Sequence, residues 1–162
     1  MIAFVDVHYG ELRARAGCVV AAGWRDERPV REAVAEVDVA AEYVSGELYR
    51  RELPPILAVL TGQDDLTCIV VDGHAWLGPD RPGLGVHLHR ALGERIAVVG
   101  VAKNPFVGAP AIPVLRGESA RPLWVSAIGL DAALAAAEIA TMHGEHRIPT
   151  LLRRADHLAR GT

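Results

Sequence analysis

The chain has 162 residues, of which 51% are hydrophobic and 23% are charged, and its formal net charge is −3. A length of this order predicts one domain, spanning residues 1–162, and the composition excludes a disordered chain. No apolar run reaches the roughly 18 residues of a membrane span, and no basic leader precedes the first apolar segment. We therefore expect a cytoplasmic protein with no membrane partner.

The small negative charge argues mildly against a nucleic-acid partner, because such proteins usually carry a basic excess. The objection is weak for a nuclease, whose active site itself collects carboxylates while a local basic patch contacts the phosphates. Cys18 and Cys68 both lie in apolar runs, which indicates buried thiols and suits a reducing compartment.

The first part of the chain reads as three strands joined by short turns, which predicts an antiparallel meander. These strands are expected over residues 2–8, 13–22 and 30–41. A helix should follow over residues 48–60, with Ser45 as a plausible N-cap. Pro54 and Pro55 are awkward inside a helix, so they either start its regular part or kink it.

The rest of the chain alternates between short apolar strands and helices. It is predicted to contain a buried strand over residues 69–71, a loop over 74–82, a helix over 84–92, a strand over 96–101, an irregular stretch over 105–113, a hairpin of 114–117 and 122–128, and helices over 131–142 and 151–160. A meander followed by βαβ units predicts an α/β fold with a mixed central sheet and helices on both faces. This order of elements is that of the ribonuclease H-like fold.

Two apolar strands each end in a single carboxylate, Asp6 and Asp72. A carboxylate at the end of a buried strand is tolerated when a cation binds it. Each aspartate alone is more simply a turn residue, since Asp is common where strands end. The repetition favours a shared divalent-metal site on neighbouring strands.

Three further residues are candidates for the same site. Glu52 opens the first helix with the spacing of an inward face, although an exposed Glu paired with an Arg is about equally compatible. Asp156 lies on a basic helix, where a solvated charge is the simpler interpretation. Lys103 follows a buried strand and should emerge at the same sheet edge as Asp72, where its ammonium could hold a phosphate. The histidines show no HExxH-type spacing, so zinc is not expected.

Together these segments resemble the endonuclease V (deoxyinosine 3′-endonuclease) family over nearly the whole chain. The resemblance rests on residues 5–7 (VDV), 43–54 (YVSGELYRRELP), 71–74 (VDGH), 83–88 (GLGVHL), 100–103 (GVAK) and 152–156 (LRRAD). It implies a ribonuclease H-like fold and DNA repair by Mg²⁺-dependent cutting on the 3′ side of a deaminated purine, with Mn²⁺ as an alternative ion. Damaged DNA is the implied partner, with RNA as the alternative.

The resemblance also implies roles for individual residues. The metal-site carboxylates of the family fall on Asp6, Glu52 and Asp72, its final-helix position on Asp156 and its lysine on Lys103. The strand-separating wedge of the family falls on residues 43–46. The resemblance implies substrate binding at Tyr43 and Gly46 of this wedge and also at Gly73 and Arg81.

The chain departs from the family pattern after Asp72. Gly78 stands where the family has a His, Asp80 stands where it has an Arg, and Arg81 lies one place on. These departures leave a second hypothesis open: a relative that binds nucleic acid without cleaving it. Its binding surface would be basic, formed by Arg50, Arg51, Arg153 and Arg154.

Overall fold

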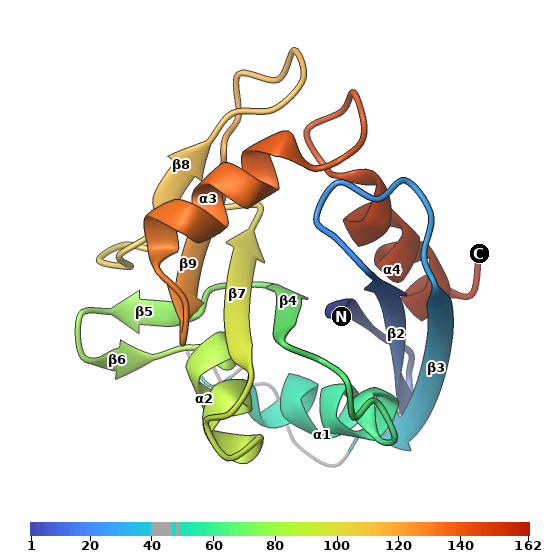
Figure 1. The fold of residues 1–162 in the computed structure, drawn as a ribbon. Coiled ribbons are helices and arrows are strands. Elements are labelled where there is room, and N and C mark those ends of the chain that lie inside the picture. Colours follow the sequence, from blue (N-terminus) through green and yellow to red (C-terminus); the bar gives the residue numbers. More distant parts are fainter. Residues whose placement is uncertain (40–46, 48) are drawn as a thin grey trace.

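A computed structural model describes residues 1–39, 47 and 49–162 (Figure 1). Within these residues, seven strands form one sheet in the order β3-β2-β1-β4-β7-β9-β8. They are β1 (Ile2–Tyr9), β2 (Arg13–Ala21), β3 (Arg31–Asp38), β4 (Cys68–Asp72), β7 (Ala97–Ala102), β8 (Ile112–Val114) and β9 (Leu123–Ile128). Two short strands, β5 (Trp76–Gly78) and β6 (Arg81–Pro82), pair with each other in a second sheet.

The sheet is mixed, as the sequence predicts. β1, β2 and β3 form the expected antiparallel meander. β1, β4 and β7 run parallel to one another, whereas β9 is antiparallel to β7 and to β8. The carboxyl ends of β1, β4 and β7 therefore share one edge of the sheet, which is where open α/β sheets usually bind their ligands.

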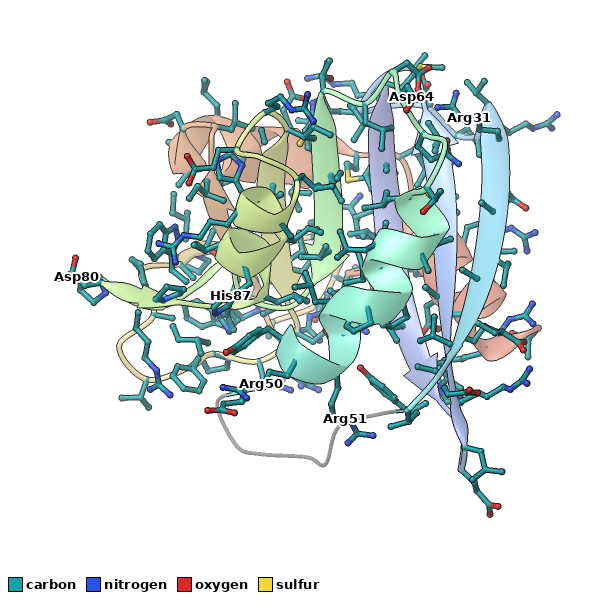
Figure 2. All side chains as sticks on the ribbon, turned by 90° about the horizontal axis from the view of Figure 1, so that it is seen from below. Arg31, Arg50, Arg51, Asp64, Asp80 and His87 are labelled. Carbon is teal, nitrogen blue, oxygen red and sulfur yellow. The ribbon has the colours of Figure 1, made fainter. Side chains whose placement is uncertain are left out.

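Helices cover both faces of this sheet. They are α1 (Tyr49–Leu60), α2 (Leu84–Ala91), α3 (Ala132–Thr141) and α4 (Thr150–Arg160). Ile56 of α1 and Leu88 of α2 pack in one apolar core, and Figure 2 shows these two helices in front of the strands. Ile139 of α3 and Leu151 of α4 pack in the core on the opposite face, with Phe4 of β1.

Burial patterns along the strands follow from their places in the sheet. β4 is central, and its residues from Cys68 to Val71 are buried, as expected for a parallel strand covered on both faces. β3 forms an edge and alternates between partly buried and exposed positions. Cys18 and Cys68 are buried, and neither forms a disulfide within the described residues.

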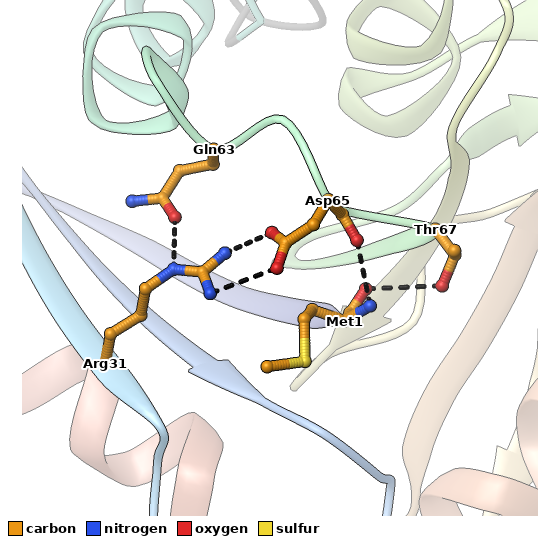
Figure 3. Close-up of polar contacts among 5 residues, drawn as sticks. All are labelled: Met1, Arg31, Gln63, Asp65 and Thr67. Atoms are coloured by element: carbon orange, nitrogen blue, oxygen red, sulfur yellow. Dashed lines mark hydrogen bonds and ion pairs between the residues drawn. The ribbon is translucent and has the colours of Figure 1, made fainter.

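At the edge opposite the carboxyl ends, polar contacts fix where β1 begins (Figure 3). The Met1 ammonium donates to the carbonyl of Asp65 at 2.9 Å, and the Thr67 amide donates to the carbonyl of Met1 at 2.9 Å. Arg31 donates to Gln63 at 2.7 Å and also binds the Asp65 carboxylate. These contacts set the register of β1 against β4 and thereby place the carboxyl ends of the two strands at the same level of the sheet.

Some predicted boundaries are wrong. Residues 74–82 are not a plain loop, because they contain the β5–β6 ribbon, which the Trp76 indole anchors by donating to the carbonyl of Ala127 at 3.1 Å. β8 covers Ile112–Val114, so it begins inside the stretch predicted to be irregular, 105–113, and ends at the first residue of the predicted strand 114–117. α1 begins at Tyr49, so Pro54 and Pro55 do not mark its start. The proposed cap, Ser45, lies outside the described residues.

No helix in the described part of the chain combines the length and apolar character needed to cross a membrane.

Candidate active site

Asp6 and Asp72 are neighbours at the carboxyl edge of the sheet. Val5 and Val71 are register partners in the parallel β1–β4 pair, and each aspartate follows its valine directly. Asp6 accepts a hydrogen bond from the Val7 amide at 2.8 Å. The two carboxylates lie near enough for the charge of Asp72 to raise the pKa of Asp6.

Glu52, from the first turn of α1, completes a group of three carboxylates. It lines a tight space together with Asp6 and Asp72, beside Leu84 at the start of α2. Burial, followed by the charge of Asp72, raises the pKa of Asp6 to about 7. Burial, followed by the charges of Asp72 and Asp6, raises the pKa of Glu52 to about 8. The group therefore concentrates negative charge where water solvates it poorly.

Lys103 supplies positive charge to this group. Its ammonium donates to Asp72 Oδ2 at 2.5 Å, and both side chains are partly exposed. Lys103 is the only lysine among the 17 lysine and arginine residues of the chain. Burial opposes its ionisation, but the charge and hydrogen bond of Asp72 outweigh it and raise the pKa of Lys103.

Asp156 approaches the same group from α4. It lines a cavity of about 160 Å³ with Asp6, Asp72 and Lys103, and Arg160 donates to its Oδ1 at 2.8 Å. Burial opposes the ionisation of Asp156, but the hydrogen bond from Arg160, the contact with Asp6 and the charge of Lys103 outweigh it. The pKa of Asp156 consequently lies below its ordinary value. The structure thus gathers all five predicted catalytic positions around one edge of the sheet.

The donor set fits a hard divalent cation by its chemistry. Mg²⁺ prefers carboxylate oxygens, and a cation would offset the charge that raises the pKa values of Asp6 and Glu52. Among the residues that the structure describes, no three His, Cys, Asp or Glu side chains form a ready-made ligand shell. Oδ2 of Asp72 is directed to Lys103 instead. The role of these carboxylates as metal ligands stays a prediction.

The residues predicted to bind substrate are less completely placed. Tyr43 and Gly46 lie outside the described residues. Gly73 follows Asp72 directly and has a φ of +144°, a conformation that favours glycine. The guanidinium of Arg81 lies 5.5 Å from the ring centroid of Phe106, and Figure 2 places Asp80 at the far tip of the β5–β6 ribbon.

The arginines assigned to a basic binding surface differ in their partners. Arg154 binds Glu32 through two hydrogen bonds of 2.7 and 2.8 Å, and Arg50 pairs with Glu47 at 2.9 Å. Arg153 instead lines the 160 Å³ cavity. The four arginines therefore do not form one uniform basic surface.

Sequence reasoning missed three residues around the site. Arg160 pairs with Asp156, and the i, i+4 spacing was a usable signal for that pair. The guanidinium carbon of Arg51 lies 4.5 Å from the ring centroid of Tyr9. Burial, followed by the charge of Glu52, raises the pKa of Tyr9. Arg147 bonds to the backbone carbonyl of Lys103, a contact that no local pattern announces.

Known proteins resemble this chain in sequence and in fold. The family model for Endonuclease V matches residues 1–129. Endonuclease V of Streptomyces avermitilis is 37% identical, with 96% of this chain and 77% of the relative covered. The relative from Thermococcus kodakarensis is 32% identical, with 97% and 76% covered.

Solved structures of endonuclease V proteins also resemble this chain in fold. The crystal structure of endonuclease V from S. avermitilis superposes with a TM-score of 0.82 at 34% identity, covering 99% of this chain and 79% of that one. A Ciona intestinalis endonuclease V, crystallised with a 24mer DNA containing an inosine followed by a ribo-adenosine, gives 0.83 at 19% identity, covering 99% and 84%. The predicted ribonuclease H-like fold is confirmed. On the match across residues 1–129 and the identity to these relatives, the chain belongs to the endonuclease V family.

Proposed function

We propose that this protein is a divalent-metal-dependent endonuclease that hydrolyses a phosphodiester on the 3′ side of deoxyinosine or another deaminated base in DNA, in DNA repair. The observation that carries the proposal is the convergence of Asp6, Glu52 and Asp72 at one sheet edge, with Lys103 against Asp72. A group of carboxylates that raise one another's pKa is unfavourable without a cation, so it points to metal chemistry.

In the proposed mechanism Asp6, Glu52 and Asp72 hold Mg²⁺, with Mn²⁺ as an alternative. A bound ion of this kind would supply activation of the attacking water and neutralisation of charge on the phosphate. Lys103 stabilises the negative charge that develops on the phosphate oxygens, because its ammonium lies at the edge of the carboxylate group. Asp156, which accepts a hydrogen bond from Arg160, orients the site from the side of α4.

The choice of substrate rests on the family and on its complexes. The Ciona intestinalis relative is bound to inosine-containing DNA, which supports a deaminated base as the recognised lesion. Gly73, next to Asp72, and Arg81 on the β5–β6 ribbon are proposed to contact the substrate near the cut, together with Tyr43 and Gly46. Inosine in RNA is the alternative substrate.

The test is a cleavage assay on matched oligonucleotides. One DNA carries a single deoxyinosine, a second carries deoxyadenosine at that position, and an RNA carries inosine, each with Mg²⁺ or Mn²⁺. We expect one cut 3′ to the inosine, and a rate at least about 100-fold lower for Asp72→Asn, because a charged ligand is lost. Asp64→Asn, at the opposite edge of the sheet, is the matched control and should keep the wild-type rate (Figure 2). No cutting by wild type with any substrate and metal would reject the proposal.

A second candidate is a relative that binds inosine-containing nucleic acid without cleaving it. Gly78 and Asp80 favour it, because they replace a His and an Arg of the family pattern. The partners of Arg154 and Arg50 weigh against it, since Glu32 and Glu47 already neutralise two of its four cations. Binding that survives Asp6→Ala, with no product from wild type, would favour this candidate.

A further inference from the structure

The segment between α3 and α4 is organised by a buried arginine. Arg116 is only 6% exposed, and its guanidinium donates to four backbone carbonyls of this segment. The acceptors are Met142 at 2.5 Å, Gly144 at 3.0 Å, His146 at 3.1 Å and Arg147 at 3.4 Å. Bonds from one planar guanidinium to four carbonyls fix the backbone of a segment that has no regular secondary structure.

From this fixed segment, Arg147 reaches back to the central sheet. Its Nη2 donates to the carbonyl of Lys103, immediately after β7, and to the carbonyl of Pro122, immediately before β9, the latter at 2.8 Å. The side chain is partly buried. Arg147 therefore ties the ends of two antiparallel strands together at the point where Lys103 leaves the sheet.

The residue after Lys103 is also held. His74 Nε2 donates to the carbonyl of Asn104 at 2.9 Å, and Arg121 donates to Asn104 Oδ1 at 3.4 Å. The backbone at Lys103 and Asn104 is thus fixed by Arg147 and His74, which come from two separate segments, and Arg121 holds the side chain of Asn104.

We infer that Arg147 is a positioning residue: it holds the backbone of Lys103 so that the lysine ammonium stays against Asp72. The inference deepens the proposed function and rests on it for the catalytic role of Lys103. A lysine side chain has four rotatable bonds, so its ammonium is placed reproducibly only when its backbone is fixed and its tip has a partner. Asp72 fixes the tip, and Arg147 fixes the backbone.

The kinetic test is a double-mutant cycle on the inosine-containing DNA with Mg²⁺. Misplacement of a reacting group by about 1 Å can slow a reaction by about 100-fold, so Arg147→Ala should lower kcat by about 10- to 100-fold with little change in KM. Arg147→Lys, which keeps a donor, should recover part of the loss. In the Lys103→Ala background, adding Arg147→Ala should have no further effect, because the group that it positions is already gone.

The second test does not depend on activity. Because Lys103 is the only lysine, protein labelled with [¹³C,¹⁵N]lysine gives side-chain NMR signals from this residue alone. Arg147→Ala should shift or broaden the Cε signals relative to those of the wild-type protein. Arg95→Ala, an exposed arginine outside the site, is the control and should leave them unchanged.

These readouts separate the two claims. Unchanged Lys103 signals in Arg147→Ala, or losses that add in the double variant, would overturn the positioning role. If Arg147→Ala shifts the Lys103 signals but the wild-type protein cuts none of the substrates, the positioning role is supported and the proposed nuclease activity is rejected. Thermal denaturation of each variant shows whether a lower rate reflects unfolding, and the NMR comparison is made on variants that remain folded.

Discussion

Arg160 donates to Asp156 one turn earlier on α4, with Nε 2.8 Å from Oδ1, so an arginine that the family pattern did not point to orients a predicted active-site carboxylate. Arg160→Ala should remove this bond and let the pKa of Asp156 rise toward its ordinary value. If catalysis needs Asp156 ionised, the acidic limb of the pH–rate profile should move to higher pH. The measurement is kcat/KM for inosine-containing DNA, followed down to the lowest pH at which wild type and variant both stay folded.

The same variant should hardly change stability. An i, i+4 ion pair at the surface of a helix contributes little to stability, so the denaturation midpoint of Arg160→Ala should stay close to that of wild type. A pH–rate profile that does not move, in a folded variant, would show that Arg160 does not act through Asp156.

The three carboxylates should make the metal-free protein less stable as pH rises. The pKa of Asp6 goes from 3.8 to about 7 on folding, and that of Glu52 from 4.5 to about 8. A carboxyl whose pKa is raised by folding stabilises the fold fully below its unfolded value, and this contribution is lost as pH rises through the folded value. In a chelator, Tm should therefore fall between about pH 4 and pH 8.

Asp6→Asn tests this origin of the pH dependence, because it removes one charge from the group and relieves Glu52. In the same chelating buffer, its Tm should decline less steeply than that of wild type and should be higher at pH 8. A wild-type Tm that is flat or rising over this range would contradict the raised pKa values.

The part of the site that lies on regular strands could be predicted from sequence. A buried apolar run that ends in an aspartate is a weak signal alone, but two such runs on parallel neighbours place Asp6 and Asp72 side by side. Lys103 was located by the same reasoning, from the end of β7. Glu52 was ambiguous, because the spacing of α1 fits an inward face and a paired surface equally well.

The parts that escaped prediction depend on contacts with backbone atoms far away in sequence. Arg116 and Arg147 have backbone carbonyls as partners, and such partners cannot be recognised from residue identity. The β5–β6 ribbon lies in a stretch rich in Gly and Pro, and it depends on the bond from Trp76 to Ala127. Glycines that look like loop residues also permit close packing: a Cβ on Gly100 would lie 2.4 Å from the Ala75 amide.

Binding of Mg²⁺ should stabilise the folded protein if the three carboxylates hold it. A ligand that binds only the folded state raises its stability by about 2.7 kcal/mol at 100 times its Kd. We expect Tm at pH 8 to rise on titration with Mg²⁺ or Mn²⁺. Glu52→Gln keeps the shape of the side chain but loses its charge, so its Tm should respond much less. Equal responses of wild type and Glu52→Gln would remove Glu52 from the ligand set.

The adjacent arginines Arg153 and Arg154 should behave differently, because only one of them lines the cavity beside the carboxylates. A cation that contacts a phosphate contributes about one unit to the slope of log affinity against log salt. Arg153→Ala should therefore weaken binding of inosine-containing DNA and reduce that slope by about one. Arg154→Ala should leave the slope unchanged, since Arg154 is bound to Glu32 by hydrogen bonds of 2.7 and 2.8 Å and lies partly exposed on the face toward β3.

Binding is measured by fluorescence anisotropy with catalytically inactive Asp72→Asn protein over a series of salt concentrations. Equal slopes for the two arginine variants would contradict the prediction that Arg153, and not Arg154, contacts the nucleic-acid backbone.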